Sequence, residues 1–280
     1  MEQLVTTQWL ADELGADDLV VLDCTVYLKM TDEGFVAESG RANCEAGHIP
    51  GAGFACLTTD LVDTASPHRF AVPAPAEFAA AMEQLGVSDT SRVVLYDDNN
   101  AMWAARVWWM LHWIGFDNAA LLDGGLKAWK AEDRPLSTDA PSPARGSLTV
   151  AHRPQTIADK AEVMAAIDDG ATCLIDALPE ASFSGEMVMY GRPGHIPGAA
   201  NASAFSMVDP DTGRFLALDE LRTRMPEDST ARVVNYCGGG IAASATAFLQ
   251  TMMGFKDVAV YTASLQEWVQ DPNAPMTTAV

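Results

Sequence analysis

Short apolar runs alternate with longer amphipathic stretches along most of the chain, and this alternation predicts its secondary structure. A short apolar run predicts a buried strand, and apolar positions that recur with helical spacing predict a helix. The predicted strands are residues 19–23, 92–97, 119–124, 172–177, 232–237 and 257–262, and the predicted helices are residues 75–86, 102–116, 160–170, 218–225 and 242–254. Strands that alternate with helices form parallel sheets flanked by helices, so the sequence predicts the α/β class.

A repeat divides the chain into two similar halves. The hexapeptide "GHIPGA" occurs at residues 47–52 and again at residues 194–199. Two further echoes follow in the same order: "RVVLYDDNN" against "RVVNYCGGG", and the stretches that end at Trp129 and Trp268. A period of roughly 140 residues is too long for a solenoid and indicates a domain duplication.

The joint between the halves lies in "DRPLSTDAPSPARGS", which is rich in Pro, Ser and Ala and has no apolar periodicity. Such a composition is typical of a linker. We therefore predict a first domain at residues 1–135, a linker at 136–150 and a second domain at 151–280. Both domains are expected to be parallel sheets flanked by helices.

Composition and net charge limit the classes of partner and the cellular location that we expect. The chain has 280 residues, 49% of them hydrophobic, and a formal net charge of -21. Nucleic acids and anionic membranes require basic patches, so we expect neither as a partner. We also expect no signal peptide and no membrane span, because the opening residues lack a basic and then apolar stretch and no apolar run is long enough. The predicted location is therefore the cytoplasm.

The five cysteines also argue against structural cross-links. They are odd in number, none forms a CxxC pair, and no secretory signal accompanies them. A disulfide framework and a zinc site of the usual spacing are therefore not expected.

One cysteine lies in a position that favours chemistry. In "VVNYCGGGIAAS", Cys237 ends a predicted strand and precedes three glycines and a predicted helix. Ligands of parallel α/β sheets bind at the carboxyl ends of strands, where loops enter helices. A phosphate-binding P-loop is excluded here, because no Lys-Ser/Thr pair follows Gly240.

Two other interpretations of this loop fit less well. Gly238, Gly240 and Ala243 match the dinucleotide pattern G-x-G-x-x-A, but the acidic residue that follows, Asp257, precedes a strand instead of ending one. Cysteine phosphatases place an arginine six positions after the cysteine to bind phosphate bidentately, and Ala243 stands there. Both functions are therefore disfavoured.

Thiolate chemistry fits the loop better. Glycine N–H groups can turn inward around a sulfur atom, and the helix dipole adds partial positive charge, so both favour the thiolate. The alternative is an inert, buried Cys237 on a tight turn. The repeat weighs against that alternative, since the aligned position of the first half is Asp97. One half therefore carries a candidate nucleophile and the other does not.

The chain resembles the two-domain rhodanese family, the thiosulfate and 3-mercaptopyruvate sulfurtransferases. The resemblance rests on the duplicated "GHIPGA", the strand-end Asp23 and Asp176, the "ARVWW" helix and "CGGGIA", and it covers nearly the whole chain. A first domain with Asp97 in place of the cysteine also fits this family.

The resemblance implies a ping-pong reaction with no metal or organic cofactor. Cys237 would take sulfur from a small anionic donor, thiosulfate or 3-mercaptopyruvate, and the persulfide would pass it to cyanide or a thiol. The main-chain amides that would cradle the sulfur are those of Gly238, Gly239, Gly240, Ile241 and Ala242. A competing interpretation is a sulfur carrier or a redox sensor without turnover.

The donor stays open at this point. Thiosulfate enzymes of this family tend to carry cations on the loop, whereas mercaptopyruvate enzymes tend to carry Gly-Ser-Gly and a following Thr. Here Gly239 and Ala242 replace the two hydroxyl residues, and Leu178 and Ser182 stand where arginines are frequent. Arg192 in "YGRPGHIPGA" is the best candidate for a contact to the anion.

The duplicated polar residues are expected to be structural, because both halves have them and only one half has the cysteine. His48 and His195 should tie down the loop of the repeated motif, and Asp23 and Asp176 should accept backbone N–H groups.

Overall fold

The computed structural model describes residues 1–31 and 34–279, and the chain falls into two compact units. The first unit comprises Met1–Thr64, Val72–Arg153 and Pro210–Phe215, and the second comprises Ala65–Ala71, Pro154–Asp209 and Leu216–Val280. The main division therefore follows Arg153. The segment predicted as a linker lies within the first unit, where the Gly146 N–H donates to the Glu83 carbonyl (2.8 Å).

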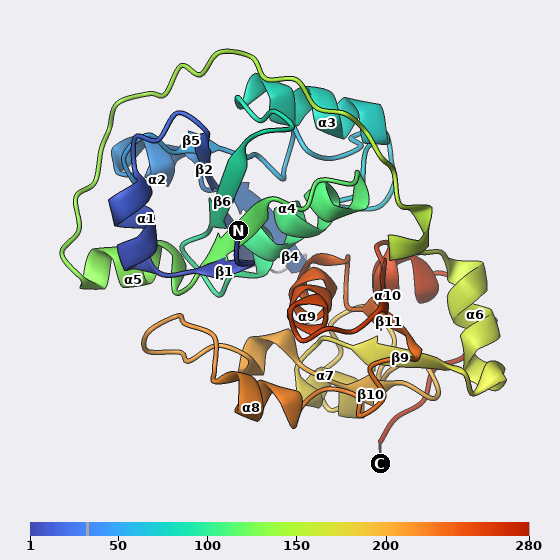
Figure 1. The fold of residues 1–280 in the computed structure, drawn as a ribbon. Helices are drawn as coiled ribbons and strands as arrows, with labels where there is room; N and C mark the ends of the chain where they lie inside the picture. The colour runs from blue at the N-terminus through green and yellow to red at the C-terminus, as the bar shows by residue number, and fades with distance from the viewer. Residues whose placement is uncertain (32–33, 280) are drawn as a thin grey trace. The chain divides into compact units, whose positions relative to one another are not determined.

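The first unit is built on a five-stranded parallel sheet with the strand order β1-β7-β6-β2-β5 (Figure 1). Its strands are β1 (Leu4–Val5), β2 (Leu19–Asp23), β5 (Gly53–Phe54), β6 (Arg92–Tyr96) and β7 (Ala119–Leu122). Its helices are α1 (Thr7–Glu13), α2 (Arg41–Ala46), α3 (Pro75–Gln84), α4 (Met102–Trp113) and α5 (Gly125–Ala131).

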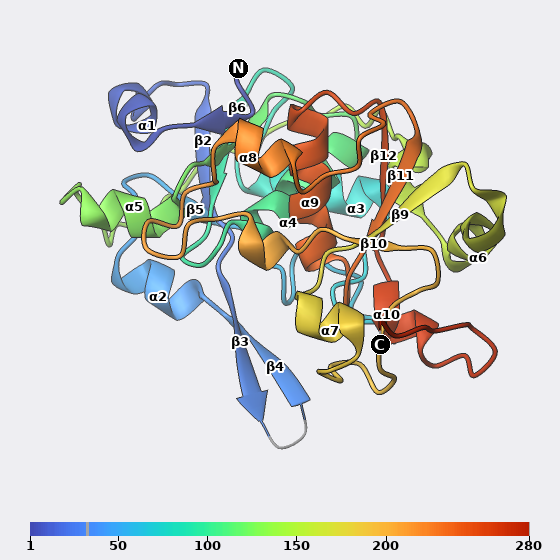
Figure 2. The same ribbon diagram turned by 90° about the horizontal axis from the view of Figure 1, so that it is seen from below.

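An antiparallel hairpin is added to this unit. Strands β3 (Val26–Thr31) and β4 (Gly34–Ser39) pair with each other and with no strand of the main sheet among the described residues. Figure 2 shows the hairpin extending away from the sheet. The sequence pattern does not predict this hairpin, because its alternation is short and Leu28 and Val36 are exposed.

The second unit repeats the parallel sheet with the order β10-β9-β11-β12-β8. Its strands are β8 (Ile157–Ala158), β9 (Thr172–Asp176), β10 (Ala200–Asn201), β11 (Arg232–Tyr236) and β12 (Asp257–Tyr261). Its helices are α6 (Lys160–Asp169), α7 (Glu180–Ser184), α8 (Leu218–Arg222), α9 (Ile241–Met252) and α10 (Ser264–Trp268), and short 3-10 turns lie at Pro154–Thr156 and Ala204–Ser206.

The two sheets correspond strand by strand, which confirms the predicted α/β class and the duplication. Asp23 at the end of β2 pairs with Tyr96 at the end of β6, and Asp176 at the end of β9 pairs with Tyr236 at the end of β11. The residues that follow Tyr96 and Tyr236 therefore leave equivalent edges of the two sheets.

A long apolar helix covers the central strands of each unit. Helix α4 packs on β6 and β7, and α9 packs on β11 and β12 (Figure 1). Helix α9 is buried from Ala242 through Gln250, because it has no polar face to turn to solvent. Its one long polar side chain, Gln250, exchanges two hydrogen bonds with Asn235 of β11 (2.7 and 3.1 Å), which fixes the helix on the strand.

None of the helices within residues 1–31 and 34–279 is both long and apolar enough to cross a membrane.

Candidate active site

Cys237 lies at the carboxyl end of β11, one residue beyond the last paired position. The strand is buried because Val233 and Val234 face the core, and Cys237 itself is 2% exposed. Gly240 is the N-cap of α9 and has a left-handed φ of 84°, a conformation that favours glycine. The loop therefore turns within the three glycines that separate Cys237, at the end of β11, from the start of α9.

One loop amide reaches the sulfur directly. The Gly240 N–H donates to Cys237 Sγ at a donor–acceptor distance of 3.1 Å. The N–H groups of Ala242 and Ala243 belong to the first turn of α9, so no carbonyl of the helix can accept from them. This arrangement can stabilise negative charge on the sulfur or on an atom bound to it.

The opposite side of the loop is held by the turn that begins α10. The N–H groups of Leu265 and Gln266 donate to the carbonyls of Cys237 and Gly238 (both 3.0 Å). Ser264, with a left-handed φ of 53°, accepts from the Cys237 N–H (3.1 Å) and donates to the Tyr261 carbonyl (2.6 Å). This turn thus occupies the carbonyls of Cys237 and Gly238 and fixes the loop on the start of α10.

Tyr190 and Arg69 also lie at this site, and neither is among the residues predicted from the sequence. A Cβ atom at Gly238 would lie 1.7 Å from the phenol oxygen of Tyr190, so a larger residue there would displace the Tyr190 ring. The backbone of Arg69 is held by Gln266, which accepts from its N–H and donates to its carbonyl (both 3.0 Å). No sequence signal identifies them, since Tyr190 lies in an irregular loop and Arg69 lies in the other half of the chain.

Arg192 contacts the C-terminal segment of the same unit through its side chain. Its Nη1 donates to the carbonyls of Asp271 (3.2 Å) and Ala274 (2.8 Å). A contact to a substrate anion would therefore fall to the remaining nitrogens of its guanidinium group.

The equivalent loop of the first unit is filled by its own carboxylate. Asp97 is 2% exposed, and its two oxygens accept from the N–H groups of Asn99, Ala101, Trp103 and Ala104, each at 3.0 Å. Burial raises the pKa of Asp97, and these four donors oppose that shift.

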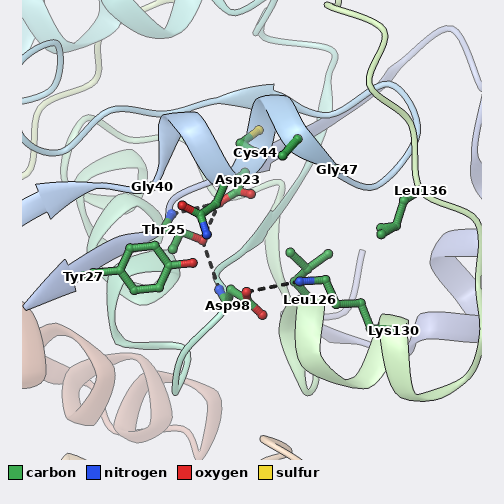
Figure 3. A pocket seen from close by; sticks show the side chains of 12 residues that line it. Asp23, Thr25, Tyr27, Gly40, Cys44, Gly47, Asp98, Leu126, Lys130 and Leu136 are labelled. Atoms are coloured by element: carbon green, nitrogen blue, oxygen red, sulfur yellow. Dashed lines mark hydrogen bonds and ion pairs between the residues drawn. The ribbon is translucent and has the colours of Figure 1, made fainter.

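The cavity near the Asp97 loop has no activated thiol. It has a volume of about 240 Å³ and is lined by Asp23, Tyr27, Cys44, Asp98 and Lys130 among others (Figure 3). Lys130 pairs with Asp98 at 3.2 Å, as the dashed line in Figure 3 marks. Burial and the charge of Asp23 raise the pKa of Cys44 to about 12, so this thiol stays protonated.

The duplicated histidines have structural partners, as the sequence predicts. The Nδ1 atoms of His48 and His195 lie 2.7 Å from the carbonyls of Cys44 and Phe183. The backbones of both histidines also form bridges, His48 to Ser137 and His195 to Thr277.

The two strand-end aspartates, Asp23 and Asp176, differ in one hydrogen-bond donor, a hydroxyl group. Asp23 Oδ1 accepts from the N–H and the hydroxyl of Thr25 (2.9 and 2.6 Å). Asp176 Oδ1 accepts the Leu178 N–H (2.8 Å), but its Oδ2 has no hydrogen-bond partner among the described residues. Burial raises the pKa of Asp176 to about 7, and hydrogen bonds from the Leu178 N–H and the Tyr236 side chain only partly oppose this shift.

The other cysteines are free thiols. Burial raises the pKa of Cys24 and of Cys173, in line with the inert role expected of buried thiols. Cys56 differs: burial acts to raise its pKa, but hydrogen bonds with Thr58 and Thr59 (both 3.2 Å) outweigh burial and lower the pKa to about 7.

Comparison with known proteins places this geometry in a family. The rhodanese-like domain model matches residues 6–132 and 159–271. A probable 3-mercaptopyruvate sulfurtransferase of Pseudomonas aeruginosa is 37% identical, covering 99% of this chain and 98% of that protein. The putative thiosulfate sulfurtransferase SseB of Mycobacterium tuberculosis is 33% identical, covering 98% and 96%.

A solved structure agrees with these matches. SseA from Escherichia coli, a 3-mercaptopyruvate sulfotransferase of the rhodanese fold, has a TM-score of 0.83 and 28% identity, covering 94% of this chain and 99% of its own. The two matched units thus define tandem rhodanese domains. The chain belongs to the two-domain rhodanese family of thiosulfate and 3-mercaptopyruvate sulfurtransferases.

Proposed function

We propose that this protein is an enzyme that moves sulfane sulfur from thiosulfate or 3-mercaptopyruvate to cyanide or a thiol through a persulfide on Cys237. The observation that carries the proposal is the position of Sγ, which accepts the Gly240 N–H at the first turn of α9. A thiolate there is a nucleophile whose charge is stabilised before the donor arrives.

In the first half-reaction the Cys237 thiolate attacks the sulfane sulfur of the donor. An S–S bond forms at Sγ, and the bond between that sulfur and the remainder of the donor breaks, with its electron pair leaving on the remainder. In the second half-reaction the acceptor attacks the outer sulfur. The S–S bond breaks, its electron pair returns to Sγ, and the thiolate is restored.

The first unit supports the proposed amide cradle. Its Asp97 oxygens accept from the N-cap residue Ala101 and from the second and third residues of α4, Trp103 and Ala104. The residues at the same positions of α9 are Gly240, Ala242 and Ala243. The cradle that we propose for the outer sulfur comprises amides of residues 238–242, with the Ala243 N–H added by this correspondence.

Arg192 remains in the proposal as a contact to the anionic donor. The competing function, a carrier that is charged with sulfur without turning over, would use the same cysteine and the same cradle. Turnover with a small acceptor distinguishes the two.

Intact-protein mass spectrometry tests the proposal. After incubation with thiosulfate or 3-mercaptopyruvate, we expect a gain of about 32 Da, one sulfur, that cyanide removes. The gain should disappear in Cys237→Ser and persist in Cys56→Ser, the matched control that removes the thiol whose pKa is lowered to about 7. No gain with either donor contradicts sulfur transfer, and a gain without repeated turnover supports the carrier.

A further inference from the structure

The phenol of Tyr190 lies against the loop at the residue that follows the nucleophile. Its oxygen lies 1.7 Å, and its ring carbon Cζ 1.8 Å, from the position that a Cβ atom at Gly238 would take. The contact requires glycine at position 238 and places a hydroxyl group beside Cys237. The loop therefore has a hydroxyl after all, supplied by a distant residue instead of by position 239 or 242.

The charges around Tyr190 keep that hydroxyl protonated. Burial raises the pKa of Tyr190, and the negative charges of Cys237 and Asp176 raise it further, while the Arg69 guanidinium lowers it. Near neutral pH the group is therefore a hydrogen-bond donor and does not add a negative charge to the site.

Arg69 is fixed relative to the same loop. Gln266 holds both backbone groups of Arg69, and its own N–H donates to the Gly238 carbonyl (3.0 Å). One guanidinium charge thus lies within electrostatic range of Tyr190. A single positive charge matches a monoanionic carboxylate better than a dianion.

The two candidate donors make different demands on such a hydroxyl. When a thiolate takes the sulfur of 3-mercaptopyruvate, the C–S bond breaks and its electron pair passes to the methylene carbon, which gives an enolate with its charge on the keto oxygen. The enolate then takes up the proton that the thiol gave up, and pyruvate leaves. Thiosulfate has no keto oxygen, and its electron pair leaves on sulfite. Only the first donor needs a hydrogen-bond donor at an oxygen that gains charge.

We propose that Tyr190 is a catalytic residue for 2-keto acid donors: its hydroxyl donates a hydrogen bond to the keto oxygen as the C–S bond breaks, with Arg69 as the counter-charge of the donor's carboxylate. This inference rests on the sulfur transfer proposed above and names the donor class of the same site, a 3-mercapto-2-keto acid in preference to thiosulfate.

The test compares two donors in one variant. In Tyr190→Phe we expect kcat with 3-mercaptopyruvate to fall about 10²-fold, the usual effect of removing one donor to a developing oxyanion. With thiosulfate, kcat/KM should change less than about threefold. An equal loss with both donors, or no loss with 3-mercaptopyruvate, overturns the inference.

Further variants distinguish a catalytic Tyr190 from one that only binds the donor or supports the loop. Arg69→Gln should raise KM for 3-mercaptopyruvate about tenfold and leave kcat unchanged, whereas a pure KM effect in Tyr190→Phe contradicts its catalytic role. Tyr27→Phe, at the cavity of the first unit, is the matched control and should match the wild type. Cys237 charged with inorganic polysulfide should pass sulfur to cyanide equally fast in wild type and Tyr190→Phe, which confirms a folded site. If the wild type gains no sulfur from any donor, the proposed function fails and the role of Tyr190 fails with it. If the wild type turns over normally and Tyr190→Phe matches it with 3-mercaptopyruvate, only the role of Tyr190 fails.

Discussion

The two rhodanese domains of this chain have different side chains at equivalent loops, Asp97 in the first and Cys237 in the second. In the first domain the Asp97 carboxylate accepts four N–H groups from its own loop and helix. In the second domain Cys237 Sγ accepts the Gly240 N–H, and the next amides of α9 have no acceptor within the helix. The N–H groups of the first loop thus have an acceptor within their own domain, whereas we propose that those of the second loop donate to an atom of the substrate. The proposed chemistry therefore belongs to the second domain, whose loop carries the cysteine.

The most direct test of this difference replaces the cysteine of the second domain by the aspartate that the first domain has at the equivalent position. Cys237→Asp should reduce cyanide-dependent turnover at least about 10³-fold, because a carboxylate cannot form a persulfide. The circular dichroism spectrum should stay native, since the loop already accommodates a carboxylate in the first domain. Turnover above a tenth of the wild-type value would show that sulfur passes through another residue.

The converse change empties the first cradle. Asp97→Ala leaves four buried N–H groups without their acceptor, and we expect the free energy of unfolding to fall by about 3 kcal/mol. Denaturant unfolding measures the loss, with Asp98→Ala as the matched control. Asp98 is partly exposed and pairs with Lys130, so its loss should be under about 1 kcal/mol. Equal effects of the two changes would contradict the saturated cradle.

The strand-end aspartates of the two domains should make different contributions to the pH dependence of stability. Asp176 has a folded-state pKa of about 7, above the value of about 4 in an unfolded chain. Its protonated form therefore favours folding. That contribution to stability is complete below about pH 4 and is lost as the pH rises through about 7.

Leu178→Thr should weaken this pH dependence, because it supplies the hydroxyl that Thr25 gives to Asp23. Each pKa unit that Asp176 recovers should reduce the loss of stability between pH 4 and pH 8 by about 1.4 kcal/mol. The slope of the unfolding free energy against pH is the measurement, and Leu178→Val is the control without a hydroxyl. Identical slopes in the two variants would show that the missing hydroxyl is not the cause of the raised pKa.

The smallest effect is expected at Arg192. Arg192→Gln should raise KM for the anionic donor about threefold and reduce stability by about 1 kcal/mol, since Nη1 is already committed to two carbonyls. Steady-state kinetics at two ionic strengths and denaturant unfolding separate the two contributions. A loss of stability with an unchanged KM would assign Arg192 to the C-terminal segment alone.

Local pattern was sufficient for the longer elements of the fold. The runs at β2, β6, β9, β11 and β12 are apolar along most of their length, and the periodic helices α3, α4, α6 and α9 begin and end within a few residues of their predicted limits. The duplicated motif then predicted two similar sheets. The two-residue strands could not be predicted in this way, because β1 exists only through its pairing with distant Leu121 and Leu122.

The residues of the candidate site also fall into two groups, those that local sequence predicts and those that it does not. Cys237 and its glycines are contiguous, so their pattern could be recognised in the sequence. Tyr190 reaches Gly238 from an irregular loop, and Arg69 reaches Gln266 across most of the chain. Their positions depend on tertiary packing, which leaves no local periodicity. The donor class could not be inferred from loop composition for this reason: the hydroxyl that distinguishes the donors is not on the loop.

The segment Ala65–Ala71 has a consequence for how this protein could have evolved. It lies in the first half of the sequence but belongs to the compact unit that contains Cys237. Conversely, Pro210–Phe215 lies in the second half of the sequence but belongs to the first unit. A gene fission at the sequence-level joint would leave each product without a piece of its own domain. A half expressed alone would therefore lack a segment of its own compact unit and carry a segment of the other.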